Sequence, residues 1–190
     1  MPFYAYDRQT RQGSSCSSTS PSSSRYELAP MEPFSFTARD GLTIHGYATF
    51  PPGAEARDGL PTVLNVHGGP WARDVWGFDP EAQWLANRGY LCVQVNYRGS
   101  TGYGKAFVNA GDREWGGKMH DDLLDAVAYA VGQGWADPAR VAIYGGSYGG
   151  YAALVGRGVH PGRVPLRGGH RRPVEPEDAD RDRSRRTGRR

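Results

Sequence analysis

The sequence predicts an α/β fold with a parallel core sheet. Three short apolar runs, at 62–67, 90–96 and 140–144, have the nearly continuous hydrophobicity of strands that are covered on both faces. Segments with helical patterning separate these runs, and this order favours right-handed crossovers between parallel strands. A serine flanked by glycines follows the last run directly, which is typical of a strand–turn–helix junction that carries chemistry.

The first 32 residues differ in composition from the rest, and we expect them to be flexible. The aromatic run at 3–8 has the composition of one strand, but no partner for it is visible in the sequence. Serine dominates the stretch 14–24, with eight of its eleven residues. Such a tract cannot bury enough apolar surface to order itself, so we predict a flexible linker here.

Residues 34–50 show the pattern of an antiparallel hairpin with one buried face. Apolar and polar side chains alternate in 34–38 and again in 42–50, and Arg-Asp-Gly at 39–41 supplies the turn between them. We expect this hairpin to extend the parallel sheet through antiparallel pairing. His45 falls between apolar positions of the second strand, so we interpret it as structural rather than catalytic.

The first crossover begins with a glycine turn and continues into a short helix. His-Gly-Gly-Pro at 67–70 follows the first apolar run directly. Further on, Asp79 precedes Pro80, and a helical pattern runs from there to residue 88 before Gly89 ends it. An aspartate cap, a proline in the first turn and a closing glycine are ordinary helix boundary signals.

The second crossover contains a glycine-rich loop at 97–104 and a longer helix at 119–131. One apolar stripe of this helix is formed by Leu123, Leu124, Val127, Ala128 and Val131. We place Asp121, Asp122 and Asp125 mainly on its outward face, where they suit the positive end of the helix dipole. Adjacent helical residues do not face one another, so a solvated or salt-bridged face is favoured over paired acid–base or metal chemistry.

The last strand leads into the motif that carries chemistry. Residues 137–139 turn the chain into the strand 140–144, and Gly-Gly-Ser-Tyr-Gly follows at 145–149. Residues 151–155 have the pattern of a helix. Gly-x-Ser-x-Gly in this setting predicts a nucleophile elbow, because residues without a Cβ let strand and helix approach closely around an exposed hydroxyl. We therefore predict Ser147 as a nucleophile.

Composition gives no reason to expect a nucleic acid or membrane partner. The net charge of +3 divides into −3 for residues 1–156 and +6 for residues 157–190, so the basic character belongs to the tail alone. Cys16 and Cys92 form neither a metal motif nor a disulfide framework, and we interpret Cys92 as a buried free thiol. We see no secretory signal and no run of about 18 apolar residues, so we expect a cytoplasmic location.

Three motifs occur in order: Asn-Val-His-Gly-Gly-Pro-Trp at 65–71, Asn-Tyr-Arg-Gly-Ser-Thr-Gly-Tyr-Gly at 96–104, and Gly-Gly-Ser-Tyr-Gly-Gly-Tyr at 145–151. Together they resemble the catalytic domain of prolyl oligopeptidase-type serine peptidases, within the α/β-hydrolase fold. The acylaminoacyl peptidase and dipeptidyl peptidase branches are the most similar. The resemblance implies that residues 33–156 form the N-terminal part of an α/β-hydrolase sheet whose C-terminal portion is missing.

The resemblance also implies a role for each matching residue. Ser147 would be the acylating nucleophile, and the backbone N–H groups of Tyr148 and Gly69 would donate to the oxyanion. We interpret His67 as shaping the oxyanion loop, because it precedes the serine whereas this fold orders its triad as serine, acid, histidine. The implied substrates are short or acylated peptides, with no cofactor and no metal.

The acid and the histidine of the triad are not visible after Ser147. Residues 157–190 contain no aromatic residue, and His160 and His170 precede the acidic residues there, which is the wrong order. We expect a disordered, arginine-rich tail that arises from a reading-frame artefact or a truncated gene product. Residues 1–32 are similarly interpreted as a possible remnant of the β-propeller that precedes this domain in the family.

Three kinds of function remain open. The first is a serine peptidase that acts through an acyl-enzyme and is inactive as this chain alone. The second is an esterase or lipase on the same fold, which the elbow alone does not distinguish, although the other two motifs favour the peptidase. The third is a non-catalytic fragment or a nucleic-acid-binding basic tail, against which stands the lack of interleaved aromatic residues.

Overall fold

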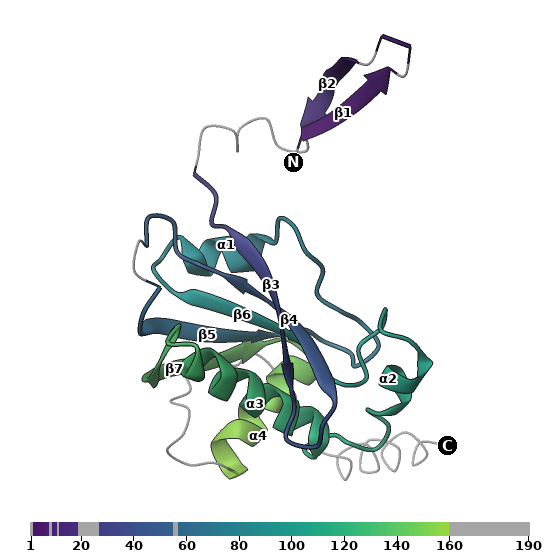
Figure 1. Cartoon of the computed structure of the whole chain (residues 1–190). Coiled ribbons are helices and arrows are strands. Elements are labelled where there is room, and N and C mark those ends of the chain that lie inside the picture. Colours follow the sequence, from purple (N-terminus) through teal and green to yellow (C-terminus); the bar gives the residue numbers. More distant parts are fainter. Residues whose placement is uncertain (1, 8, 11, 19–26, 55–56, 160–190) are drawn as a thin grey trace, which may run out of the picture.

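The computed structural model describes residues 2–7, 9–10, 12–18, 27–54 and 57–159 (Figure 1). Its main body is a five-stranded sheet in the order β3-β4-β6-β5-β7. The strands are Met31–Thr37 (β3), Thr43–Thr49 (β4), Leu60–Val66 (β5), Leu91–Asn96 (β6) and Ala136–Gly145 (β7). β3 pairs antiparallel with β4 and β4 with β6, whereas β5 runs parallel to β6 and β7. The predicted α/β class, with a parallel core extended by an antiparallel hairpin, is confirmed.

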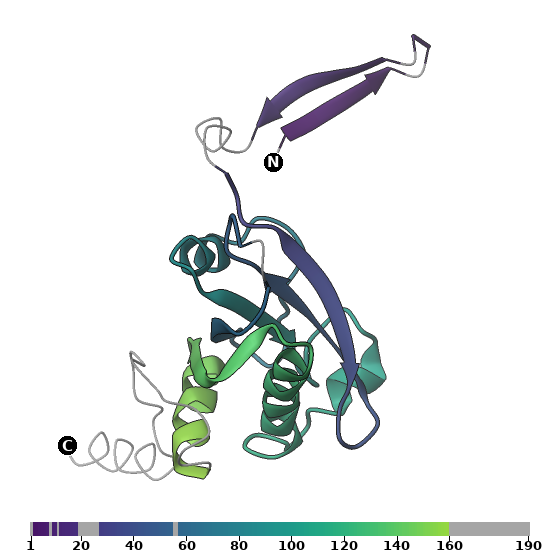
Figure 2. The same cartoon turned by 60° about the vertical axis from the view of Figure 1, so that its left-hand side comes forward.

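The described residues form four helices, which lie on both faces of the sheet. They are Pro80–Ala86 (α1), Lys105–Asn109 (α2), Lys118–Gly132 (α3) and Tyr148–Val159 (α4). Figure 2 shows α1 on one side of the sheet and α3 and α4 on the other. The cap of α1 is as predicted, since Asp79 Oδ1 accepts a hydrogen bond from Ala82 N–H at 2.7 Å. None of these helices reaches the length and hydropathy of a membrane span.

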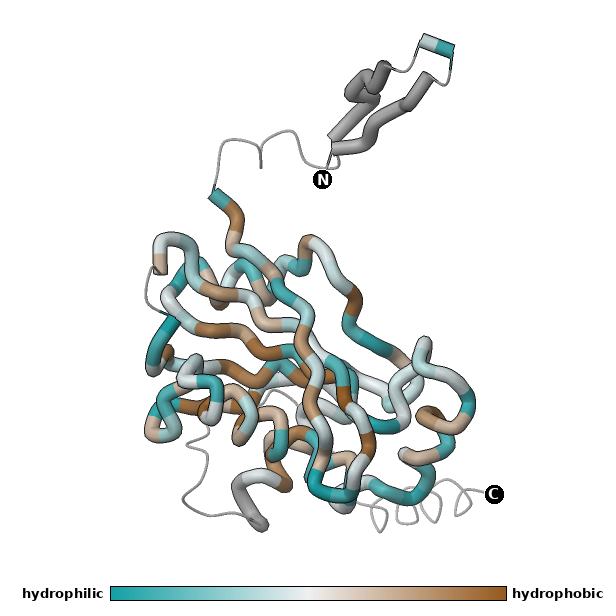
Figure 3. Tube along the Cα trace, viewed as in Figure 1, coloured by the Kyte–Doolittle hydropathy of each residue, from teal (hydrophilic) through white to brown (hydrophobic). Residues whose placement is uncertain are grey.

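Alternate residues of the parallel strands pack against opposite helix layers. Leu64 and Val66 belong to the larger core, which includes residues of α3 and α4, whereas Val63 and Cys92 pack with Leu85 of α1. Figure 3 shows the hydrophobic residues concentrated along these central strands. Cys92 is a buried free thiol, as predicted, and burial raises its pKa.

The buried face of α3 differs from the predicted stripe. Its buried apolar side chains are Met119, Leu123, Ala126 and Ala130. Ala128 is exposed and Leu124 is only half-buried. Asp122, predicted on the outward face, is fully buried. The buried face of α3 is therefore rotated from the predicted stripe toward the side that carries Met119, Asp122 and Ala126.

The turn predicted at 137–139 is an irregularity inside a longer strand. β7 already begins at Ala136, which pairs with Leu60 before the register shifts. Within the shifted segment, Asp137 Oδ1 accepts a hydrogen bond from Ala139 N–H at 2.8 Å, which is local turn chemistry. The aspartate and proline therefore bend the strand without ending it. At the other end, α4 continues to Val159, past the boundary predicted at 156.

A separate two-stranded sheet lies at the N-terminus. β1 (Pro2–Asp7) pairs antiparallel with β2 (Gln12–Ser18). The aromatic run therefore has a partner that was not visible in the sequence, and the first part of the predicted linker is a strand. Strand pairing uses backbone groups that serine carries like any other residue, so composition alone does not exclude it. The rest of the predicted linker, from residue 19, lies outside the described residues.

Candidate active site

Ser147 occupies the sharp turn between β7 and α4. Its φ is 55°, in the left-handed region that residues with a side chain rarely adopt. Backbone hydrogen bonds hold the turn: Gly149 N–H donates to Gly146 O at 2.9 Å, and Tyr151 N–H donates to Ser147 O at 3.0 Å. Strained backbone of this kind clusters at functional sites, and a sharp strand-to-helix turn is the geometry of a nucleophile elbow.

The glycines on either side of Ser147 let the turn approach the end of β5. A Cβ atom at Gly145 or at Gly149 would overlap the carbonyl oxygen of Val66. This oxygen belongs to sheet backbone, which cannot move away without disturbing the pairing of β5. The two outer glycines of the motif are therefore required by a close backbone contact.

The side chain of Tyr148 anchors the start of α4. It is 1% exposed, and its ring lies 4.8 Å from that of Tyr97 and 5.0 Å from that of Trp115, measured between centroids. The first backbone N–H groups of a helix have no partner within the helix and lie at the positive end of its dipole. The buried ring therefore fixes the position of an N–H group that immediately follows Ser147.

The glycine turn at 67–70 lies against this elbow. A Cβ atom at Gly68 would be 3.5 Å from the Cβ of Ser147. Gly69 has a φ of 140°, which residues with a side chain rarely adopt. The structure thus places the turn that contains Gly69 beside the serine, although the two are far apart in the sequence.

Both ring nitrogens of His67 are engaged by groups other than Ser147. Nδ1 lies 2.7 Å from the carbonyl oxygen of Gly68, and Nε2 lies 3.0 Å from Oγ of Ser100. The ring stacks on Tyr97 with centroids 4.4 Å apart. Burial lowers the pKa of His67, although the hydrogen bond to Gly68 opposes this effect. These contacts tie the ring to the turn and to the neighbouring loop, which suits a shaping residue.

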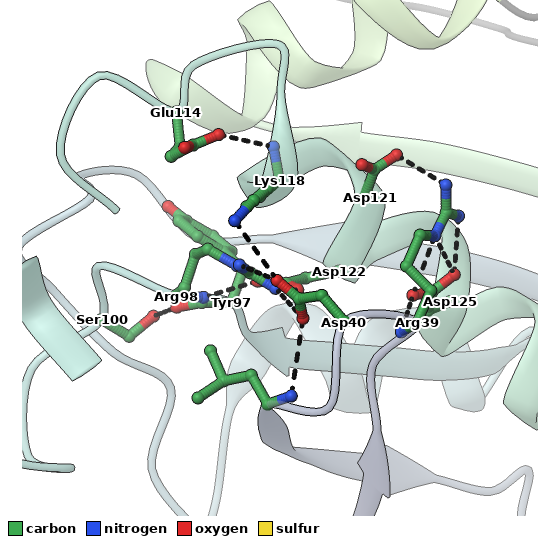
Figure 4. A network of polar contacts seen from close by, with 11 residues as sticks. Arg39, Asp40, Tyr97, Arg98, Ser100, Glu114, Lys118, Asp121, Asp122 and Asp125 are labelled. Atoms are coloured by element: carbon green, nitrogen blue, oxygen red, sulfur yellow. Dashed lines mark hydrogen bonds and ion pairs between the residues drawn. The ribbon is translucent and has the colours of Figure 1, made fainter. Parts of the chain in front are cut away.

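A buried arginine fixes the loop that follows β6. Arg98 is 3% exposed, and its guanidinium lies 2.7 Å from a carboxylate oxygen of Asp122 and 2.7 Å from one of Asp40 (Figure 4). Its backbone N–H also donates to Asp122 at 2.9 Å. Arg98 holds the pKa of Asp40 well below its usual range by hydrogen bonding. For Asp122, burial raises the pKa, and the hydrogen bonds from Arg98 oppose this rise.

The loop anchored by Arg98 supports the glycine turn directly. Thr101 N–H donates to Ala72 O at 3.0 Å. Gly99 lies so close to Pro70 that a Cβ atom on the glycine would be 2.9 Å from that of the proline. Together with the contact between Ser100 and the His67 ring, these interactions connect the buried ion pairs to the turn beside the serine.

A cavity of about 550 Å³ opens beside Ser147 and has an acidic lining. Asp74, Asp79, Glu81 and Gln94 are among the residues that line it. Burial and the neighbouring carboxylates of Asp79 and Glu81 raise the pKa of Asp74 to about 7, while a hydrogen bond from Gln94 opposes the rise. This cavity was not predicted from the sequence, because its acidic residues are spread over a loop and the start of a helix.

Asp74→Asn is expected to raise the free energy of unfolding, and this increase should be about 2 kcal/mol larger at pH 8 than at pH 5. The folded-state pKa of Asp74, about 7, lies above that of an unfolded aspartate. The folded state therefore holds an extra proton between these values, and stability falls as the pH rises toward 7. Asparagine does not ionise, so the variant does not lose this stability. Urea denaturation of both proteins at pH 5 and pH 8 measures the difference. The exposed Asp112→Asn is the control, and an equal gain for both variants would contradict the prediction.

The sequence of residues 76–162 matches the profile of the prolyl oligopeptidase family. The chain is 51% identical over 162 residues to dipeptidyl aminopeptidase BIII of Pseudoxanthomonas mexicana, an alignment that covers 82% of this chain and 24% of the relative. It is 46% identical over 173 residues to dipeptidyl peptidase family member 6 of Caenorhabditis elegans, covering 80% of this chain and 23% of the relative. The chain thus spans about a quarter of the length of these curated relatives.

Solved structures show the same similarity. An acylaminoacyl peptidase of Pyrococcus horikoshii aligns with a TM-score of 0.68 and 27% identity, over 80% of this chain and 24% of the other. An acylaminoacyl peptidase in complex with a peptide chloromethyl ketone aligns with a TM-score of 0.72 and 26% identity, over 85% and 26% of the two chains. The resemblance found in the sequence motifs and the predicted fold class are both confirmed.

Proposed function

Since residues 76–162 match the prolyl oligopeptidase family, we propose that this chain carries the nucleophile and the oxyanion donors of a serine peptidase. The observation that carries the proposal is the φ of 55° at Ser147, at a strand–helix turn packed against the end of β5. Short or N-acylated peptides are the proposed substrates. The names of the similar dipeptidyl and acylaminoacyl peptidases support this substrate class.

In the proposed reaction, Ser147 Oγ attacks the carbonyl carbon of the scissile peptide bond. The negative charge that develops on the carbonyl oxygen is stabilised by the backbone N–H groups of Tyr148 and Gly69. Donors of this kind are worth about 3–4 kcal/mol each in the transition state. The C–N bond then breaks, the amine leaves with a proton, and water hydrolyses the ester on Ser147 to release the acid.

The general base and the acid of the triad are proposed to come from outside the described residues. Among the described residues, the histidine of the turn beside Ser147, His67, has both ring nitrogens engaged by Gly68 and Ser100. His160 and His170 lie outside the described residues. A general base contributes roughly 10²–10⁴-fold to such reactions, and serine is a weak nucleophile without one. We therefore propose that this chain alone does not hydrolyse peptide bonds at a detectable rate.

A fluorophosphonate probe tests the role of Ser147. Prolonged incubation is expected to label this serine slowly, as read from the modified peptide by mass spectrometry. Ser147→Ala should abolish that labelling, whereas Ser35→Ala, an exposed serine on β3, should retain it. Labelling that is unchanged in Ser147→Ala would contradict the assignment.

Hydrolysis assays on the same samples test the rest of the proposal. No release of amine from a dipeptide anilide is expected from this chain alone. Rapid release would show that the chain contains its own base. Hydrolysis of a p-nitrophenyl ester without any hydrolysis of the anilide would favour the esterase alternative.

A further inference from the structure

One buried side chain, that of Tyr97, contacts both the glycine turn at 67–70 and the start of α4. Tyr97 directly follows β6 and is 0% exposed. Its ring stacks on that of His67, with centroids 4.4 Å apart and 16° between the ring planes. Its centroid also lies 4.8 Å from that of the Tyr148 ring. The two elements that approach Ser147 are therefore packed against the same rigid ring.

The hydroxyl of Tyr97 gives this residue a second connection to the glycine turn. It donates a hydrogen bond to the carbonyl oxygen of His67 at 2.9 Å. Burial raises the pKa of Tyr97, so the hydroxyl keeps the proton that it donates. Nδ1 of the stacked His67 ring lies 2.7 Å from the carbonyl oxygen of Gly68. Because that carbonyl and the N–H of Gly69 belong to one planar peptide group, the direction of the carbonyl sets the direction of the N–H.

At the start of α4, the contact with Tyr97 acts on the residue whose own N–H follows Ser147. The Tyr148 ring is 1% exposed and belongs to the same core as Tyr97. Protein interiors are close-packed, so this ring cannot move away from Tyr97 without leaving a void. The ring and the backbone N–H of Tyr148 are carried by one Cα atom. The packing of the ring therefore restrains the position of the N–H.

Tyr97 is itself held in place by the loop that follows it. Its carbonyl oxygen accepts hydrogen bonds from the N–H of Ser100 at 3.0 Å and from the hydroxyl of the same serine at 2.6 Å. The next residue, Arg98, forms ion pairs with the buried Asp122 and with Asp40. The backbone of Tyr97 is thus fixed on both sides, by β6 and by this loop, and its ring can act as a spacer of constant position.

We propose that Tyr97 is a positioning residue that sets the separation of the two oxyanion donors, the N–H groups of Gly69 and Tyr148. This inference rests on the proposed function, which assigns these two donors. Such donors act at about 2.7–3.1 Å from the oxygen that they stabilise, so a spacer of the wrong size weakens their combined effect. Tyr97 acts through the rings of His67 and Tyr148, and the substrate need not touch it.

Amide NMR of the phosphonylated chain tests this inference. The isotopically labelled full chain is treated with excess fluorophosphonate until Ser147 Oγ has displaced fluoride from phosphorus, which places a phosphonyl oxygen where the oxyanion would form. In wild type, the amide protons of Gly69 and Tyr148 are expected to shift downfield, because each donates to that oxygen. Tyr97→Leu removes the ring and the hydroxyl. It should abolish at least one of these shifts and slow the labelling by about 10²-fold.

Two further variants separate positioning from general stability. Phe36 is another buried aromatic residue of the same core, on β3, so Phe36→Leu should lower the melting temperature but leave both amide shifts and the labelling rate unchanged. Tyr97→Phe keeps the ring and loses only the hydrogen bond to the His67 carbonyl. It should reduce the Gly69 shift, preserve the Tyr148 shift and slow labelling by up to ~10-fold, the worth of one hydrogen bond.

Unchanged shifts and an unchanged labelling rate in folded Tyr97→Leu would overturn the inference and leave the proposed function standing. Circular dichroism shows whether this variant is folded. If it is not, Tyr97→Phe decides, and a Gly69 shift and labelling rate equal to those of wild type would overturn the inference. Absence of both shifts in the wild-type adduct would instead overturn the oxyanion assignment itself, and the inference with it.

Discussion

Arg98→Met is expected to lower the free energy of unfolding by about 3–5 kcal/mol. The guanidinium is 3% exposed and forms ion pairs with Asp122, which is fully buried, and with Asp40. Methionine replaces the aliphatic part of the side chain but leaves the buried Asp122 carboxylate without its cationic partner. Because small domains are stable by only about 5–15 kcal/mol, a loss of this size is easily measured by urea denaturation.

Arg39→Met is the matched control for this variant. Arg39 also contacts two aspartates of α3, Asp121 at 2.8 Å and Asp125 at 2.6 Å, but its side chain is 52% exposed. Exposed ion pairs contribute about 0–1 kcal/mol, because water solvates the charges when the pair is broken. Equal losses in the two variants would show that burial of Arg98 does not matter.

The loss in Arg98→Met is expected to shrink as the pH falls from 7 to 4. Burial raises the pKa of Asp122, and without the Arg98 guanidinium only the backbone N–H of residue 98 opposes that rise, so the penalty is present above the folded-state pKa and disappears on protonation. For Asp40, the wild type holds the pKa low, and the stability gained in this way is lost only as the pH falls below the ordinary aspartate value of about 4. Both effects reduce the difference in the free energy of unfolding between wild type and variant at low pH. A constant difference across this range would contradict the account.

Gly149→Ala is expected to destabilise the protein by about 3 kcal/mol or more. The added Cβ would overlap the carbonyl oxygen of Val66 and would lie 3.1 Å from its carbonyl carbon. Relief requires movement of β5 or of the Ser147 turn, so slower probe labelling of this serine should accompany the lower melting temperature. Alanine is the better helix former by about 1 kcal/mol, and the clash has to exceed this gain.

Gly150→Ala separates the clash from helix propensity. Both glycines lie in the first turn of α4, but a Cβ at Gly150 meets only the carbonyl oxygen of Gly145, at an ordinary 3.5 Å. This variant should be neutral or more stable by up to about 1 kcal/mol. If both variants gain or both lose stability to the same extent, the contact with Val66 is not what requires a glycine at position 149.

The elements that could be predicted from the sequence are those with a clear pattern of apolar residues or a recognisable cap. Strands β5 and β6 appear as apolar runs because both their faces are covered. The run in β7 was also found, although within 140–144 only Val141 and Ile143 are buried. The cap of α1 follows from Asp79 and Pro80. α2 was not predicted, since a helix of five residues is too short to show a period. The pairing of β1 with β2 was missed because it depends on backbone groups, to which composition is insensitive.

The only part of the site that could be predicted from the sequence is the one where a reactive side chain needs a specific backbone turn. Ser147 was found because a sharp turn requires glycines at fixed offsets. The buried pair of Arg98 and Asp122 was missed because charged residues are usually exposed. One signal was available, since Asp121 and Asp122 point about 100° apart on a helix, so one of the two can face inward. The cavity around Asp74 was not predictable, because it depends on how separate segments meet in space.

The position of β5 in the sheet has a consequence for synthesis on the ribosome. β5 ends at Val66, but its neighbour β7 begins only at Ala136. At roughly 5–20 residues per second, translation needs about 4–14 s to reach that neighbour. During this interval the glycine turn already exists while one edge of β5 is unpaired and open to other strands. The nascent chain is therefore most exposed to misassociation before the segment that carries the serine emerges.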